Sequence, residues 1–347
     1  MLICSRGLLV RLPVVRHCAF SSSSKHTQVF DRSLKHRQRE YALKLGDGDY
    51  YDYLREESAS NIVDRIEDIT RTFPNALELG SYRGHLLKMI GTKEDLRGQS
   101  GGVGGIQRLT QCDIVDESLL GLVGGETECT QLEAPVRAEI DRLVQASVCR
   151  VDEESSLPFD EDQFDLVLSS LSLHWVNNLP QTLLNIKQVL KPDGAFIGSM
   201  VGGDTLKELR YCFYLAEQER RGGISSHASP VAKASDVAGL MQGAGFSLPT
   251  VDIDTITISY PDAITLMEHL VHMGEGSASF NRQFHVGRDT FLAMASIYQE
   301  MFGLEDGSVP ATFEIIYMIG WKPHESQQQA CKRGSAQVSM KDIGRTP

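Results

Sequence analysis

Short apolar runs alternate with helical patterns of apolar residues over most of the chain, and this alternation constrains the fold more than any other feature of the sequence. Strand-sized runs separated by helices are typical of βαβ units, which build a parallel sheet with helices on both faces. The expected strands are residues 76–79, 108–113, 146–151, 164–169, 195–200, 250–260 and 311–321. The pattern therefore predicts an α/β fold.

Helices are expected between these strands at residues 84–90, 179–190, 205–220, 235–242, 263–273 and 288–301. Two more are expected before the first strand. In residues 30–45, Leu34, Tyr41 and Leu45 lie on one helical stripe of a charged segment, which predicts a surface helix. A loop over 46–53 separates it from a helix that carries Ile62, Val63, Ile66 and Ile69 and ends before Pro74.

Two glycine-containing segments, residues 98–105 and 121–142, interrupt the alternation between the first and third expected strands. Glycine-rich stretches between sheet elements are usually flexible surface loops, and we expect that here. An error in the gene model is the alternative explanation for both segments.

Charge and cysteine content exclude several classes of protein. The net charge is −12 and no long basic stripe offsets it, which argues against a nucleic-acid partner. The seven cysteines are dispersed, without a CxxC pair or the spacing of a zinc site, so we expect reduced thiols. The longest candidate apolar stretch, 315–319, is strand-sized, so the sequence predicts a soluble or peripheral protein.

The first thirty residues have a different composition from the rest of the chain. They contain four basic residues and a run of four serines, and they lack acidic residues altogether. This composition is typical of a mitochondrial transit peptide, which we expect over residues 1–28; a disordered basic tail is the alternative. We then expect an N-terminal helical segment over 29–73, one α/β domain over 74–324 and a disordered tail over 325–347.

A glycine turn follows the first expected strand. Glu78 lies near the end of that strand, and Gly80 and Gly84 lie in the turn that leads into the next helix. Ligands of open α/β sheets bind at the carboxyl ends of strands, where glycine lets them approach the backbone. The segment is typical of a nucleotide site, although a strand, turn and helix without a ligand also fits it.

Polar residues also lie at the ends of the next three expected strands. Asp113 ends the second and suits a ribose diol, while Asp152 and Glu153 follow the third, where Asp152 suits an adenine amino group. Ser169 ends the fourth. Each acid alone also fits a solvated loop residue or a helix cap. Their common position at one edge of the sheet favours a cofactor site.

Three further residues are candidates for substrate contacts. His174 and Trp175 follow the fourth strand, and Asp204 precedes an expected helix. The Trp175 ring offers a face for a guanidinium, and Asp204 offers a carboxylate. The alternatives are a core tryptophan with a hydrogen-bonded histidine, and a helix N-cap. No HxD or HxE pair follows a strand, so we assign no metal ligands.

Several specific motifs identify a resemblance that covers about residues 29 to 324. They are Phe30-Asp31-Arg32, Phe164 to Val167 with Ser169 to Val176, Leu190 to Gly194, Gly202 to Leu206 with Glu208 to Arg210, Asp306 to Thr312, and Tyr317 to Lys322. With them the chain resembles the class I S-adenosylmethionine (SAM)-dependent methyltransferase superfamily. Within it, the chain is most similar to a mitochondrial branch of complex I assembly factors described as arginine hydroxylases.

The resemblance implies a Rossmann-like fold with a seven-stranded, mostly parallel sheet and an antiparallel last strand. It implies SAM bound by the residues at the strand ends, and hydroxylation of an arginine in a core iron–sulfur subunit of the matrix arm of complex I. The protein would then act on assembly intermediates in the matrix, peripheral to the inner membrane. Hydroxylation also needs an oxidant, which the sequence does not identify.

The chain departs from the family pattern at Tyr82, where the glycine turn usually has its middle glycine. A side chain there is expected to crowd the methionine portion of SAM, because glycine permits close approach to the backbone. Two other functions therefore remain open. One is ordinary methyl transfer to a protein, carrier-protein, amine or carboxylate substrate. The other is a non-catalytic assembly chaperone that keeps the fold for binding.

Overall fold

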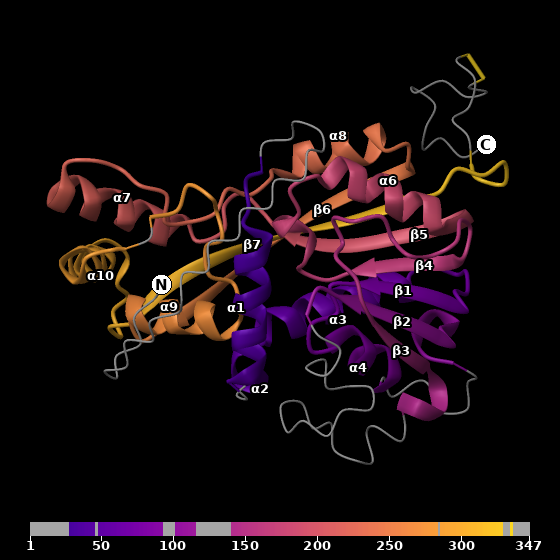
Figure 1. The fold of residues 1–347 in the computed structure, drawn as a ribbon, viewed down its shortest axis with the longest axis horizontal. Helices are drawn as coiled ribbons and strands as arrows, with labels where there is room; N and C mark the ends of the chain where they lie inside the picture. The colour runs from indigo at the N-terminus through magenta and orange to yellow at the C-terminus, as the bar shows by residue number, and fades with distance from the viewer. Residues whose placement is uncertain are drawn as a thin grey trace, which may run out of the picture.

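Seven strands form one sheet in the order β3-β2-β1-β4-β5-β7-β6 in the computed structural model, which describes residues 28–45, 48–92, 101–115, 140–283, 285–328 and 334–335 (Figure 1). β7 alone runs antiparallel to the other six strands. The strands are β1 (Asn75–Leu79), β2 (Arg108–Asp113), β3 (Gln145–Arg150), β4 (Phe164–Ser169), β5 (Leu190–Val201), β6 (Ser247–Tyr260) and β7 (Val309–Trp321). This topology confirms the predicted Rossmann-like fold with its antiparallel last strand.

Strand positions agree with the sequence pattern because the central strands are buried on both faces. Every residue of β4 is buried, and its bounds are those predicted. The main difference is at β5, which begins at Leu190 rather than at 195. Leu190 pairs with Phe164 across a register shift, so a residue expected at the end of a helix begins the strand.

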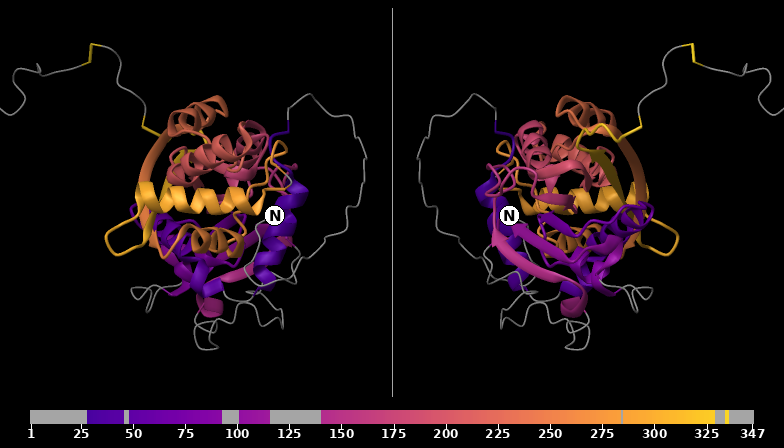
Figure 2. Two further views of the ribbon diagram at one scale, coloured as in Figure 1. Left: turned by 90° about the vertical axis from the view of Figure 1, so that its left-hand side faces the viewer. Right: turned by 90° about the vertical axis from the view of Figure 1, so that its right-hand side faces the viewer.

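Helices cover both faces of the sheet (Figures 1 and 2). One face packs against α3 (Tyr53–Glu67) and α4 (His85–Thr92), and the other against α6 (Leu179–Val189) and α8 (Ala234–Gly243). The remaining α-helices are α1 (Arg32–Lys44), α2 (Gly48–Tyr51), α7 (Lys207–Arg221), α9 (Ala263–His272) and α10 (Arg288–Phe302). Two buried clusters of apolar side chains, one on each face, form the main core.

The prediction of a surface helix with an apolar stripe is wrong for α1. Its buried face includes Lys35 and Arg39, which are fully buried, whereas Tyr41 is 56% exposed. Apolar periodicity identifies the face that packs on a hydrophobic core, but here part of the buried face is basic. Figure 1 shows α1 standing beside the edge of the sheet where the parallel strands end.

The glycine segment at 101–105 also differs from its prediction. It is not an exposed loop, because residues 101–103 are buried and Val103 belongs to the core. A Cβ on Gly102 would lie 2.6 Å from Ile90, and one on Gly104 would lie 2.5 Å from Ile66. Glycine therefore allows the backbone itself to pack against the core.

Smaller corrections concern two helix starts. The expected loop over 46–53 contains the short helix α2. Helix α7 begins at Lys207 with Leu206 at its N-cap, so Asp204 and Thr205 precede the helix and do not cap it. The Thr205 hydroxyl instead donates to the Glu314 carbonyl oxygen at 3.0 Å.

Other predictions concern residues that lie largely outside the described ranges. They are the transit peptide, the part of the 121–142 segment before residue 140, and most of the C-terminal tail. Within the described ranges, no helix combines the length and apolar character needed to cross a bilayer.

Candidate functional site

The turn between β1 and α4 brings the backbone close to a neighbouring loop. Gly80 and Gly84 have φ angles of +73° and +74°, and the Gly80 and Ser81 amides donate to the Cys112 carbonyl oxygen at 2.8 and 3.0 Å. A Cβ on Gly80 would overlap the Ser172 side chain and lie 3.2 Å from Glu153. Glycine at position 80 is thus required both by conformation and by the approach of the loop after β4.

Replacing Gly80 with alanine is expected to lower the free energy of unfolding by about 2 to 4 kcal/mol, through left-handed strain and overlap with Ser172. The matched control is Gly239→Ala in α8, where an added Cβ meets nothing within 4 Å. That change is expected to stabilise the protein by about 0.5 to 1 kcal/mol. Urea unfolding of both variants measures the difference. Equal effects of the two substitutions would contradict the packing role of Gly80.

Tyr82 adopts a backbone conformation that glycine favours, with φ +48°. Its side chain is 2% exposed and packs with Leu43 of α1 and with Val115. The Arg55 guanidinium lies over the ring, 4.2 Å from its centroid. The ring therefore joins the glycine turn to α1 and α3.

Glu78 is a buried carboxyl group near the end of β1. It is 1% exposed, and the one hydrogen bond its side chain accepts from the described residues comes from Gln111 Nε2, at 2.8 Å. Burial raises the pKa of Glu78 to about 8. Ser169, at the end of β4, donates its hydroxyl hydrogen to the Leu79 carbonyl oxygen at 2.9 Å. Among the described residues, no cation pairs with the Glu78 carboxyl group, and the Ser169 hydroxyl group is already hydrogen-bonded.

Asp113 ends β2 and is fully buried. One of its carboxylate oxygens accepts from the Tyr82 amide at 2.9 Å, and the other from the Val115 amide at 3.1 Å. These bonds fix the carboxylate beside the glycine turn. Each oxygen has two lone pairs, so the group retains capacity to accept from a ligand.

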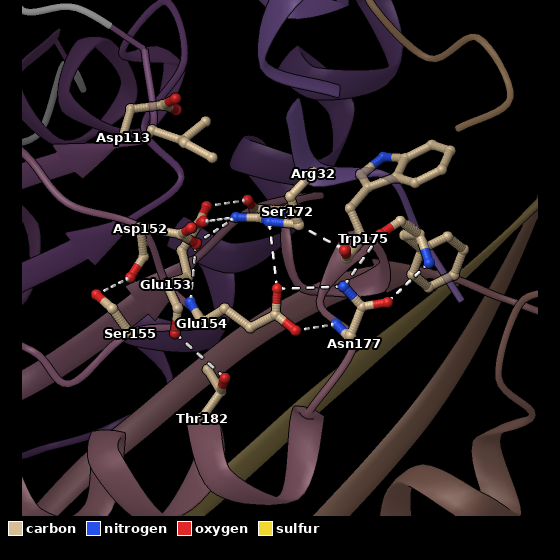
Figure 3. A network of polar contacts seen from close by, with 12 residues as sticks. Arg32, Asp113, Asp152, Glu153, Glu154, Ser155, Ser172, Trp175, Asn177 and Thr182 are labelled. Atoms are coloured by element: carbon tan, nitrogen blue, oxygen red, sulfur yellow. Dashed lines mark hydrogen bonds and ion pairs between the residues drawn. The ribbon is translucent and has the colours of Figure 1, made fainter. Parts of the chain in front are cut away.

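Arg32 of α1 lies among three acids that follow β3 (Figure 3). Its Nη2 donates to Asp152 Oδ1 at 2.8 Å and to Glu153 Oε2 at 2.5 Å, and its Nε lies 3.6 Å from Glu154 Oε2. Glu153 is fully buried, and its other oxygen accepts from the Ser172 hydroxyl at 2.7 Å. Although burial opposes charge, the two arginines near Glu153, Arg32 and Arg39, lower its pKa.

Glu275, which follows α9, joins the substrate candidates to α1 and α3. Trp175 Nε1 donates to it at 2.7 Å, His174 Nε2 lies 3.3 Å away, and Arg55 Nη2 donates at 2.5 Å. Burial opposes ionisation of Glu275, but the charge of Lys35 and the hydrogen bond of His174 hold its pKa below the usual range. Burial also lowers the pKa of His174, which favours the neutral imidazole.

Lys35 occupies one face of the Trp175 ring. Its ammonium nitrogen lies 3.3 Å from the ring centroid and donates to the Gly274 and Gly276 carbonyl oxygens, each at 2.9 Å. Burial lowers the pKa of Lys35 well below its ordinary value. The tryptophan is 4% exposed, so the face expected to receive a ligand guanidinium already holds a cation of the chain itself.

The structure thus brings the sequence candidates to the edge where the parallel strands end, and Asp204, which follows β5, is the one that is exposed. Asp204 lies in an exposed turn before α7, where its charge acts on Arg210. Sequence reasoning missed five residues at this edge, namely Arg32 as a side-chain partner of the acids, Lys35, Arg39, Arg55 and Glu275. The i, i+3, i+7 spacing of the three on α1 was a usable signal, because it places them on one helix face.

The described residues include no group of three or more His, Cys, Asp or Glu side chains arranged to hold a metal ion.

Comparisons with known proteins give both a family and a domain. Residues 106–198 match the model of a methyltransferase domain. Zebrafish (Danio rerio) "Arginine-hydroxylase NDUFAF5, mitochondrial" is 47% identical over 93% of this chain and 92% of its own length. The human (Homo sapiens) protein of that name is 45% identical over 94% and 86%. A malonyl-[acyl-carrier protein] O-methyltransferase of Gallionella capsiferriformans is 31% identical over 52% of this chain and 59% of its own.

Proposed function

Because this chain belongs to the family of mitochondrial arginine hydroxylases named NDUFAF5, we propose that it is an enzyme that hydroxylates an arginine side chain of a protein. Its relatives match it over nearly the whole chain, and the fold is that of the class I methyltransferases. The substrate we propose is a core iron–sulfur subunit in the matrix arm of complex I, modified during assembly.

The observation that carries this proposal is the 47% identity to an arginine hydroxylase over 93% of this chain. The site itself shows carboxylates that hold guanidinium groups of the chain. Asp152 and Glu153 hold Arg32, and Glu275 holds Arg55. A guanidinium is planar and permanently charged, so a site for it needs carboxylates with acidic surroundings. The net charge of −12 would also steer a basic segment toward the protein.

The chemistry of the acceptors fits SAM. Asp113 keeps acceptor capacity for a ribose diol. The hydrogen bonds that the Asp152 carboxylate accepts from described residues end at Oδ1, which leaves Oδ2 for an adenine amino group. Glu78 is a buried acid that a cationic ligand would balance. We therefore propose that SAM is held by Glu78, Gly80, Gly84, Asp113, Asp152, Glu153 and Ser169. When bound, SAM supplies a methyl group on a sulfonium cation.

For the substrate arginine we propose His174, Trp175 and Asp204 as the contacting residues. His174 and Trp175 are tied together by Glu275, and burial keeps His174 neutral, so its imidazole can exchange a proton. Asp204 is exposed and offers a carboxylate to an incoming guanidinium. Because Lys35 lies over one face of Trp175, the substrate would contact the part of the indole that Lys35 leaves free.

The protein is mitochondrial, as its relatives are. We propose that it works in the matrix, peripheral on the inner membrane, after loss of a leader that ends near residues 21–27. Its partners would be complex I assembly intermediates, since the substrate subunit must be reached before the matrix arm is complete.

Mass spectrometry of complex I subunits from cells that lack the protein tests this function. We expect an arginine of a core iron–sulfur subunit to lose one oxygen atom relative to normal cells, and wild-type protein to restore it. Asp204→Asn is expected to restore about tenfold less modification, through the loss of one charge-assisted contact. Glu305→Gln, another exposed acid, serves as the matched control and should restore it fully.

Two other outcomes would overturn the hydroxylase proposal. A difference of one methyl group would assign ordinary methyl transfer, which the matched methyltransferase domain favours as the second candidate. No mass difference in any subunit, together with lost complex I assembly, would assign a chaperone role. Full activity of Asp204→Asn would be consistent with hydroxylation but would show that Asp204 is not part of the substrate site.

A further inference from the structure

Arg39 of α1 is fully buried, yet only one of its side-chain nitrogens donates a hydrogen bond to a described residue. Nη2 donates to Ser172 Oγ at 3.1 Å. Nη1 lies 3.8 Å from Asp113 and 3.7 Å from Glu153, which is beyond hydrogen-bond distance, and Nε has no acceptor among the described residues. Arg39 therefore keeps unused donors in the interior.

Two neighbouring side chains have the same deficiency. Arg55 is 5% exposed and donates from Nη2 to Glu275, but its Nε meets no acceptor within the described chain. His174 bonds Glu275 through Nε2, and its buried Nδ1 is likewise without a described partner. The charges of Arg39 and Arg55 both act on Lys35, for which Glu275 is the opposing charge. Arg39 and Arg55 are thus buried cations with unmet donors, and both lie close enough to Lys35 for their charges to lower its pKa.

A buried donor without an acceptor costs about 1 to 3 kcal/mol, and more when the donor is charged. Native structures keep such groups rarely, and a ligand that supplies the missing acceptor explains them. The missing acceptor should be anionic, because the unmet donors of Arg39 on α1 and Arg55 on α3 belong to guanidinium groups.

We propose that Arg39 and Arg55 bind the carboxylate at the methionine end of SAM. This inference rests on the proposed cofactor site, because Arg39 contacts Ser172, Glu153 and Asp113, while Arg55 stacks on Tyr82 of the glycine turn. The carboxylate is the only anionic group of SAM, whereas its ammonium and sulfonium are cations that the acid Glu78 suits. The cofactor and the site are then complementary in charge.

The test compares two ligands that differ only in this carboxylate, S-adenosylhomocysteine and its decarboxylated analogue. Calorimetry on the full chain is expected to show that the wild type binds the analogue about 10- to 100-fold more weakly, because charge-assisted hydrogen bonds are lost. Arg39→Met keeps an unbranched apolar side chain that reaches as far as the Nε position and removes the guanidinium donors. This substitution should weaken the binding of S-adenosylhomocysteine by a similar factor and leave the binding of the analogue unchanged.

Arg220→Met, at an exposed arginine of α7, is the matched control and should bind both ligands like the wild type. The wild-type comparison does not depend on any substitution, so it can still overturn the inference where Arg39→Met unfolds. Equal binding of the two ligands by the wild type, or an equal loss of both in Arg39→Met, would overturn the inference. Binding of neither ligand by the wild type would instead refute the cofactor site on which it rests.

Discussion

Glu153→Gln is expected to lower the free energy of unfolding by about 3 to 5 kcal/mol, the loss typical of breaking a buried ion pair. Glu153 is fully buried, and its carboxylate faces Arg32 at 2.5 Å and Arg39 at 3.7 Å. Glutamine preserves the shape of the side chain but removes its charge. The Arg39 guanidinium then stays buried with less negative charge beside it. Urea unfolding followed by circular dichroism measures the change.

The control for this prediction is Glu305→Gln, which neutralises an exposed acid and should change stability by less than about 0.5 kcal/mol. A loss of unfolding free energy below about 1 kcal/mol in Glu153→Gln would mean that Asp152 and Glu154 balance the charge of Arg32 without Glu153. The strand-end acids would then not hold α1 in place.

Glu78→Gln is expected to stabilise the protein relative to wild type as the pH rises. The folded-state pKa of Glu78 is about 8, against 4.5 as its ordinary value, so wild-type folding prefers the protonated acid. Its favourable contribution is complete below pH 4.5 and is lost as the pH rises through about 8. The loss amounts to roughly 5 kcal/mol at pH 9, and glutamine avoids it.

Urea unfolding of both proteins between pH 5 and pH 9 checks this sign. The stability difference between Glu78→Gln and wild type should grow with pH, because all other groups titrate alike in the two proteins. A difference independent of pH would show that Glu78 is ionised in the folded state throughout, with a cation nearby.

The central strands of the sheet were predictable from sequence because they are buried on both faces and read as apolar runs. β2 and β4 have the predicted bounds, and β7 begins only two residues earlier than expected. The common position of the strand-end acids was also predictable, because parallel strands end at one edge of the sheet. The partners of these acids were not predictable, because side-chain pairing depends on the tertiary fold.

Helix α1 shows why periodicity failed at the site. Apolar patterns detect faces that bury hydrocarbon, whereas Lys35 and Arg39 are buried by carbonyl groups, carboxylates and a ring. Glu275 gave no signal at all, because it lies outside any periodic element between Gly274 and Gly276. Such a residue is identified only when the loop is placed beside α1.

The contacts between Lys35 and the carbonyls near Glu275 join residues 239 and 241 positions apart, which has a consequence for the order of folding. A chain made from its N-terminus completes α1 long before this loop exists. Closing so long a loop carries an entropic cost that only later contacts repay, so the association is slow. During that interval the basic face of α1 stays hydrated, and the enzyme has the helix but not the site until its last third has folded.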